Sequence, residues 1–306
     1  MYQTNMTKKR LPRISIVTPS LNQGVFLEQT ICSILDQGYP NLDYIIVDGG
    51  SNDNSKNIIQ KYEKHLSFWC SEPDAGHYDA INKGFSKATG DIFAWLNSDD
   101  MYCPWALRTV ASIFNQIHEV NWLTTLSPLF WDSEGYCYGA GSIPGYSKRA
   151  YLNGLNLPWD GPWTIQQEST FWRRSVWDNA GGLNLQYQLA ADFDLWGRFF
   201  MQTELYGLNS PLAGFRAHRN QRSHQEENYR KEARRSLAET RMKMGWTEKM
   251  CLPLQSNDRR NRYIRKLISI KNGLTARKNV GKNINRVVLE NENIWHVNEV
   301  VYRDAT

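Results

Sequence analysis

The stretch IFAWLNSDDMY, residues 92–102, decides the fold that we expect for this chain. Its apolar first half has the length and composition of a buried β-strand. The strand then ends in a polar turn that carries two adjacent carboxylates, Asp99 and Asp100. Neighbouring like charges destabilise a site unless a cation or a shared proton compensates them. The pair is therefore either a turn in which both aspartates accept backbone N–H groups, or a place where a cation binds.

The same arrangement recurs along the first hundred residues. RISIVTPSLN (13–22) and LDYIIVDGGSNDNS (42–55) are also apolar runs that close in polar loops, and amphipathic helical patterns such as GVFLEQTICSILDQ (24–37) separate them. Strands that alternate with helices predict an α/β fold with a Rossmann-like, mostly parallel sheet flanked by helices. Ligands of such sheets bind at the carboxyl ends of the strands, where these polar loops lie.

The length of 306 residues allows one large domain with an appendage. We predict one main region over 1–240, with a nucleotide-binding half at about 13–115 and a second half at about 116–240. Residues 241–306 form a basic C-terminal extension, which we expect to be helical. Residues 259–286 contain ten basic residues and no acidic one. A basic amphipathic segment either lies on an anionic membrane surface or forms a solvated helix on the main region.

Other partners and compartments are limited by composition. Nucleic-acid binding is disfavoured because no recognised nucleic-acid module accompanies the basic segment. The five cysteines are odd in number and form no C-x-x-C pair, which argues against a disulfide framework or a zinc site. The N-terminus lacks the apolar region of a signal peptide, and no apolar run reaches the ~18 residues of a membrane span. We expect a cytoplasmic protein, peripheral at the inner membrane face if the basic segment binds lipid.

Several side chains are candidates for chemistry on residue type and position alone. The aspartate pair suits Mg²⁺ or Mn²⁺, which prefer oxygen ligands. Asp48 ends the second strand, where it would bind a base or ribose or act as a turn residue. Asp192 and Asp194 are either general bases or helix-capping residues. His218 is a metal or phosphate ligand or a structural histidine. No glycine-rich phosphate-binding loop is present to support an ATP or dinucleotide site.

Five segments in this order resemble the family 2 glycosyltransferases of the GT-A fold. They are SIVTPSLNQ (15–23), YIIVDGGSNDNS (44–55), SEPDAGHYDAINKGFSKATGDIFAWLNSDD (71–100), QQESTFWRR (166–174) and GGLNLQYQLAADFDLWGRF (181–199). The resemblance implies a nucleotide-sugar donor, commonly UDP-linked, a divalent cation, Mn²⁺ or Mg²⁺, and an inverting transfer. The acceptor would be a saccharide or a lipid-linked saccharide in polysaccharide or glycan assembly.

The resemblance also implies roles for individual residues. It implies nucleotide contacts at Pro19, Ser20, Asp48, Asp74 and Asp99, metal ligands at Asp100, Asp99 and His218, and a catalytic base at Asp192. The family often has Glu-Asp at the position of the base, whereas this chain has Ala191-Asp192. This departure leaves Asp194 as a substitute base, and it leaves a catalytically silent nucleotide-sugar or glycan-binding module as an alternative.

The acceptor side is the least defined part of the sequence. In PWDGPWTIQQESTFWRR, the aromatic residues would stack on a sugar ring and the polar residues would bind its hydroxyls, or the same residues pack in the core. The acceptor candidates in this segment are Trp163, Gln167, Glu168 and Trp172. The Q-x-x-R-W signature of processive synthases is absent, so we expect one sugar per encounter. A sugar nucleotidyltransferase is a further alternative, but its glycine-rich basic loop is missing.

Overall fold

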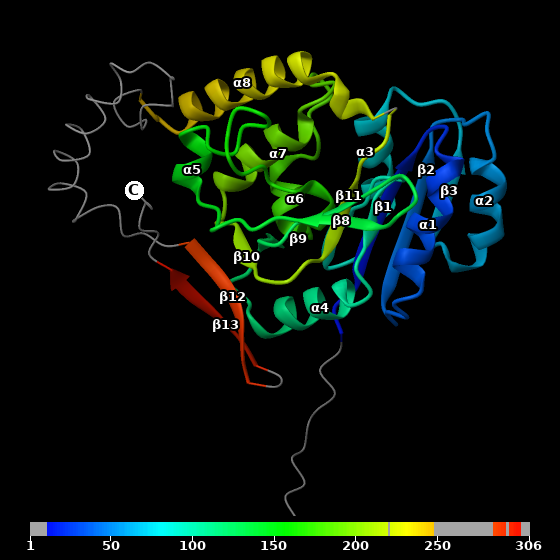
Figure 1. Cartoon of the computed structure of the whole chain (residues 1–306), viewed down its shortest axis with the longest axis horizontal. Helices are drawn as coiled ribbons and strands as arrows, with labels where there is room; N and C mark the ends of the chain where they lie inside the picture. The colour runs from blue at the N-terminus through cyan, green and yellow to red at the C-terminus, as the bar shows by residue number, and fades with distance from the viewer. Residues whose placement is uncertain (1–10, 220, 248–283, 292–293, 301–306) are drawn as a thin grey trace, which may run out of the picture.

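The computed structural model describes residues 11–219, 221–247, 284–291 and 294–300, and it has a central sheet with helices on both faces (Figure 1). The strands are β1 (Ile14–Ser20), β2 (Leu42–Asp48), β3 (Phe68–Ser71), β4 (Ile92–Trp95), β5 (Met101–Tyr102), β6 (Trp122–Thr125), β7 (Leu129–Trp131), β8 (Cys137–Ala140), β9 (Phe171–Arg173), β10 (Tyr206–Leu208), β11 (Ala213–Arg216), β12 (Ile284–Asn291) and β13 (Ile294–Val300). The α-helices are α1 (Gly24–Leu35), α2 (Ser55–Tyr62), α3 (His77–Lys87), α4 (Ala106–Gln116), α5 (Lys148–Leu152), α6 (Arg174–Ala180), α7 (Ala191–Phe200) and α8 (Glu226–Lys243). Short 3₁₀ turns are η1 (Glu63–His65), η2 (Gln167–Ser169) and η3 (Arg222–His224).

The large sheet is mostly parallel, as the sequence predicts. Its described strands follow the order β13-β12-β10-β6-β9-β4-β1-β2-β3. The pairs β1–β2, β1–β4, β2–β3, β6–β10 and β10–β12 are parallel, whereas β9 is antiparallel to both of its neighbours. Parallel strands end at the same edge, so the polar loops after β1, β2 and β4 come together there.

Each central strand is buried on both faces, which explains its continuous apolar sequence. In β1, Ile14 and Ile16 face a core under α1, α2 and α4, whereas Val17 faces the opposite core with α3. The helix α3 lies close to the strand because Gly84 has no side chain. A Cβ at Gly84 would lie 2.4 Å from Cγ1 of Val17.

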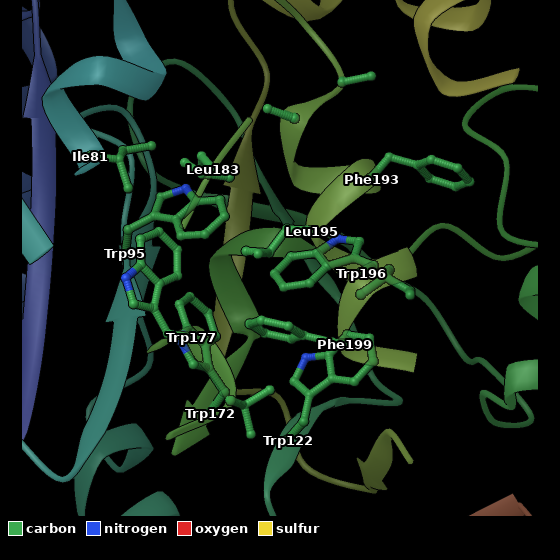
Figure 2. Packing of buried hydrophobic residues seen from close by; sticks show 14 of the residues in the cluster. Ile81, Trp95, Trp122, Trp172, Trp177, Leu183, Phe193, Leu195, Trp196 and Phe199 are labelled. Atoms are coloured by element: carbon green, nitrogen blue, oxygen red, sulfur yellow. The ribbon is translucent and has the colours of Figure 1, made fainter. Parts of the chain in front are cut away.

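The second core is dominated by aromatic rings from the sheet and from α6 and α7 (Figure 2). The indole of Trp196 lies 5.8 Å from that of Trp95 and 5.3 Å from that of Trp122. Trp172 in β9 and Trp177 in α6 pack against each other beside them. Many of the tryptophan residues of this chain therefore pack in the core that supports α7.

A smaller sheet, in the order β5-β11-β7-β8, lies across the carboxyl edge of the large one. The segment LYGLNSPLAGFRAHR, which reads as a single strand, is in fact divided between β10 of the large sheet and β11 of the small one. Pro211 lies between them, and it cannot donate to a strand ladder. This break carries the chain from one sheet to the other and places Arg216 at the edge.

The expected helical extension is wrong for residues 284–291 and 294–300, whereas its first residues, 241–243, are the end of the helix α8. Residues 284–291 and 294–300 form the antiparallel pair β12–β13, and β12 continues the large sheet beside β10. The β-branched run of Val287 and Val288 favours a strand. Trp295 also donates from its indole N–H to Ser112 Oγ of α4 at 3.0 Å. Residues 248–283, which hold most of the basic segment, lie outside the described residues, so the predicted division of the chain remains a prediction.

No helix within the described residues combines the length and the apolar character that crossing a bilayer requires.

Candidate functional site

The loops after β1 and β2 lie side by side at the carboxyl edge of the sheet. Ser20 is the register partner of Asp48, and the N–H of Gly49 donates to the Ser20 carbonyl at 2.8 Å. The carboxylate of Asp48 is buried and accepts the Ser51 N–H at 2.9 Å and hydroxyl at 2.5 Å, and the Ser71 hydroxyl at 2.7 Å. Pro19 precedes Ser20 in β1. The pairing of β1 with β2 therefore holds together Ser20 and Asp48, two of the predicted nucleotide-binding residues.

Asp74 lies in the adjacent loop after β3. Its Oδ1 accepts the N–H of Gly76 at 2.8 Å. A Cβ at Gly49 would lie only 2.9 Å from Oδ2 of Asp74, so the two loops approach too closely for a side chain there. Asp74 thus lies next to the Asp48 loop, as the predicted nucleotide contacts require.

The aspartate pair occupies the turn between β4 and β5. Thr30 of α1 holds this turn by donating its hydroxyl to the carbonyls of Ser98 at 2.9 Å and Asp100 at 2.8 Å. Asp100 is 1% exposed and accepts the backbone N–H of Arg216 at 2.9 Å. Burial, together with the charge of Asp99, raises the pKa of Asp100 well above its ordinary value.

Two side chains at the end of β11 and just after it, Arg216 and His218, face this pair. His218 Nε2 lies 2.9 Å from Asp99 Oδ2. Arg216 is fully buried, and its Nε–H donates to the Asp99 carbonyl at 2.5 Å. Phe26 of α1 packs on both, with its ring 4.5 Å from the imidazole and 5.0 Å from the guanidinium carbon. Sequence reasoning named His218 but missed Arg216, although Arg216 stands only two residues before it at the end of an expected strand.

A third carboxylate, Glu168, belongs to the same cluster. It lies on η2, which is fixed because Gln167 Nε2–H donates to the Trp95 carbonyl at 2.8 Å. Glu168 is 3% exposed. Burial and, more weakly, the charge of Asp99 raise its pKa to about 7. Within the described part of the chain, its Oε1 and the Oδ1 of Asn97 are buried without a hydrogen-bond partner.

These residues fit a hard divalent cation. The guanidinium of Arg216 donates to the backbone carbonyls of Asp99 and Ser133, so within the described residues it forms no ion pair with the carboxylates of Asp99, Asp100 or Glu168. Their oxygen atoms are the ligand type that Mg²⁺ and Mn²⁺ prefer. Among the described residues, no group of three or more His, Cys, Asp or Glu side chains is arranged so that it could hold a metal ion by itself. An ion would therefore need oxygen atoms of the substrate to complete its coordination.

Asp192 occupies the first turn of α7, where the helix dipole favours a negative charge. The Tyr229 hydroxyl of α8 lies 2.6 Å from Oδ1 and 2.8 Å from Oδ2, and the Tyr78 hydroxyl lies 3.5 Å from Oδ1. Burial raises the pKa of Asp192, and the hydrogen bond from Tyr229 opposes this rise. A carboxylate with a raised pKa is a stronger base, and this one is oriented by its tyrosine partners.

Asp194 has a different environment. It is 5% exposed, and its Oδ2 binds Arg198 at 2.7 Å to Nη2 and 2.8 Å to Nε. The Ser236 hydroxyl of α8 donates to its Oδ1 at 3.3 Å. The carboxylate of Asp194 is thus committed to the packing of α7 against α8. Of the two candidates for the base, Asp192 is the one with an exposed side.

Glu232 of α8 holds the segment that leads into Asp192. Its carboxylate accepts the backbone N–H groups of Gln188 at 3.0 Å, Leu189 at 2.8 Å and Ala190 at 2.9 Å. These groups precede the first turn of α7, so Glu232 fixes the approach of that helix. Sequence reasoning missed Glu232 because no local pattern reveals a contact across more than forty residues.

The segment that follows β11 contacts both the aspartate pair and the surroundings of Asp192. His218 lies against Asp99, and Arg222, four residues later, lies with its guanidinium carbon 5.3 Å from the ring of Tyr78 beside Asp192. Arg222 also donates to the Gln188 carbonyl. Four residues span at most about 14 Å. The short segment after β11 therefore contacts the aspartate pair through His218 and the surroundings of Asp192 through Arg222.

The predicted acceptor residues do not form one surface. Trp172 is fully buried, with its ring 5.4 Å from Trp95 and 5.6 Å from Phe199. The expectation that it contacts an acceptor is corrected, because β9 places it in the core (Figure 2). Glu168 and Gln167 lie at the aspartate cluster instead. Trp163 packs partly buried against the aromatic core.

Comparison with known proteins supports the resemblance seen in the sequence. Residues 15–125 match the family model for glycosyl transferase family 2. An uncharacterized glycosyltransferase of Mycobacterium tuberculosis is 30% identical over 183 residues, which cover 59% of this chain and 66% of that protein. The putative teichuronic acid biosynthesis glycosyltransferase TuaG of Bacillus subtilis is 38% identical over 94 residues, covering 30% of this chain and 37% of TuaG. The matches thus span just under two thirds and about a third of these relatives.

Solved structures share the fold at low sequence identity. S. aureus TarS, crystallised with UDP-GlcNAc, superposes with a TM-score of 0.57 at 15% identity, over 74% of this chain and 66% of that one. The mannosyltransferase PcManGT of Pyrobaculum calidifontis, crystallised with GDP-Man and Mn²⁺, gives a TM-score of 0.55 at 16% identity, over 76% of this chain and 65% of that one. At this identity the likeness establishes the fold alone.

Proposed function

We propose that the chain is a family 2 glycosyltransferase that moves a sugar from a nucleotide-sugar donor to an acceptor hydroxyl with inversion of the anomeric centre. A UDP-linked donor is favoured because TarS and a glucosyl-3-phosphoglycerate synthase were crystallised with UDP-sugars. TuaG is a putative teichuronic acid biosynthesis glycosyltransferase. The similarity to TuaG favours a role for this chain in polysaccharide assembly, with a saccharide or lipid-linked saccharide as the acceptor.

One observation carries this proposal. The segment from His218 to Arg222 contacts the carboxylate cluster of Asp99, Asp100 and Glu168 through His218 and the surroundings of the separate carboxylate of Asp192 through Arg222. An inverting transfer needs both parts: one that neutralises the departing diphosphate, and one that takes a proton from the attacking hydroxyl on the other face of the sugar.

The residues of this chain would divide the work as follows. Asp192 accepts the acceptor proton while Tyr229 keeps its carboxylate oriented, and the acceptor oxygen forms its bond to the anomeric carbon as the bond to the diphosphate breaks. Asp99 and Asp100, with His218, would hold a divalent cation, Mn²⁺ or Mg²⁺. When bound, such an ion supplies positive charge to the departing diphosphate. The reaction needs no covalent intermediate.

The donor nucleotide would lie along the carboxyl edge formed by Pro19, Ser20, Asp48 and Asp74. The hydroxyl of Ser20 is buried and has no hydrogen-bond partner among the described residues, so it has bonding capacity to spare. The carboxylate of Asp48 accepts three hydrogen bonds and has room for a fourth, as a base N–H would require.

The first experiment is a thermal-shift screen of UDP, GDP and their common sugars, with and without Mn²⁺. A ligand that binds the folded state raises its apparent stability. We expect a stabilisation by one nucleotide that requires Mn²⁺ and is lost in Asp100→Asn. Asp178→Asn is the matched control, because Asp178 is an exposed aspartate paired with Arg174 on α6.

A nucleotide shift that survives in Asp100→Asn would contradict the proposed role of the pair. Release of UDP from the donor then separates an enzyme from a silent binding module, since a module binds the donor without turning it over. Transfer of one sugar per encounter, a cytoplasmic location and contact of the basic segment with an anionic membrane are parts of the same proposal, and each needs its own test.

A further inference from the structure

An exposed tryptophan with a strained backbone lies beside the proposed base. Trp159 is 40% exposed, and its φ of 60° places it in the left-handed region. A residue with a side chain pays roughly 1–2 kcal/mol for this conformation. Such strain persists where the surroundings enforce it, and it concentrates at functional sites. Trp159 is more than half buried, yet a substantial part of its surface stays accessible to a ligand.

The turn that carries Trp159 is fixed on both sides. Asp160 Oδ2 binds Arg234 of α8 at 2.7 Å, and its Oδ1 lies 3.9 Å from Arg230. On the other side, a Cβ at Gly161 would lie 2.2 Å from the carbonyl oxygen of Leu155, so only glycine fits there. The ring of Trp159 is therefore presented by a rigid turn.

This turn contacts Tyr229, which binds Asp192. The ring of Trp159 meets the ring of Tyr229 edge to face, with centroids 5.2 Å apart at an angle of 73°. The hydroxyl of Tyr229 is the one that binds both carboxylate oxygens of Asp192. Residues of the same turn, Asn156 and Pro158, line a cavity of about 10 Å³ with Asp192, which is roughly the space for one water molecule.

We propose that Trp159 is the stacking platform for the sugar ring of a saccharide acceptor, which places an acceptor hydroxyl at Asp192. This inference rests on the proposed glycosyl transfer and assigns a residue that positions its acceptor. The apolar face of a pyranose packs on an indole, whereas its hydroxyls point outward from the ring edge. One ring on Trp159 would therefore present a hydroxyl toward the Tyr229–Asp192 pair.

The charges around Trp159 favour a neutral sugar over an anionic acceptor. Both nearby guanidinium groups, on Arg230 and Arg234, are paired with Asp160, and Arg230 also binds Glu226 at 3.3 Å. A phosphate or carboxylate on the acceptor would thus meet no unpaired cation at this turn.

The test uses the full chain and saturation-transfer NMR with methyl glycosides of glucose, galactose, mannose and N-acetylglucosamine. Trp159→Gly removes the ring but keeps the backbone relaxed at positive φ. We expect at least one methyl glycoside to bind the wild-type protein, and about five-fold or more weaker binding to Trp159→Gly, with Trp159→Phe in between. Trp105→Ala, which removes another exposed tryptophan, should leave this binding unchanged.

Two outcomes would overturn the inference: equal binding of the glycosides to Trp159→Gly, or no glycoside binding to the wild type while 3-phosphoglycerate binds. The Mn²⁺-dependent thermal shift by the donor nucleotide is measured on the same samples. Its persistence in Trp159→Gly keeps the proposed glycosyl transfer independent of this inference, and its absence in the wild type would count against both.

Discussion

The two aspartates of α7 allow a matched test of which one is the base. Asp192→Asn and Asp194→Asn are the same chemical change two residues apart on one helix. We expect opposite consequences, because the structure gives the two carboxylates different partners. Asp192 is held by tyrosine hydroxyls, whereas Asp194 neutralises a largely buried arginine.

The expected magnitudes follow from these partners. Removing one member of a buried ion pair costs about 3–5 kcal/mol, since the other charge is left uncompensated. Asp194→Asn leaves Arg198, 17% exposed at its side chain, in that position. For Asp192 we expect the opposite effect on the free energy of unfolding. Burial raises the pKa of Asp192, so its ionised form destabilises the folded state at neutral pH. Asp192→Asn should keep or slightly raise stability while turnover falls about 10²–10⁴-fold.

The assay combines urea unfolding with UDP release, expressed per folded molecule. Unfolding gives the stability of each variant, and the folded fraction corrects the rate. Full stability with lost turnover in Asp194→Asn would refute the assignment of the base. Unchanged turnover in Asp192→Asn would refute it as well.

Three further predictions concern stability. Burial raises the pKa of Glu168 to about 7 from an ordinary 4.5, so the metal-free protein should lose stability as the pH rises between these values. Glu168→Gln should remove up to about 3 kcal/mol of this loss. Unfolding measured at pH 5 and at pH 8 tests this prediction. Gly84→Ala should cost about 1–3 kcal/mol through its clash with Val17, whereas Gly139→Ala, whose Cβ would meet nothing closer than 3.7 Å, should be far milder in the same unfolding assay. Trp172→Ala should lower the free energy of unfolding by about 3–5 kcal/mol but preserve turnover per folded molecule. A selective loss of acceptor affinity in this variant would instead show that Trp172 contacts the acceptor.

The central strands were predictable because a parallel strand with helices on both faces must be apolar throughout. The runs of β1, β2 and β4 meet that condition. The edge strand β3 is short and only partly buried, so its sequence carries no comparable signal. The strand pair β12–β13 was missed because it begins at the end of the basic run 259–286 and was assigned with that run to one helical extension, although residues 284–300 contain only one arginine.

The site was predictable where one residue sits at the end of a predicted strand. Asp48, Asp99 and Asp100 are of this kind. Arg216 and Glu168 were not, because their relation to the aspartates arises only when separate segments fold onto one edge. A pairing such as Arg216 with Asp99, 117 residues apart, leaves no mark on local sequence.

The pairing of β12 with β10 changes what the basic segment is in the topology of the chain. Residues 248–283 connect α8 to a strand of the catalytic sheet, so they form an insertion tethered at both ends and not a terminal tail. A variant that stopped at residue 247 would lack β12 and leave that side of β10 as an open ladder, which invites aggregation. The role of the basic residues is therefore better tested by replacing 248–283 with a short flexible linker that keeps β12 in place.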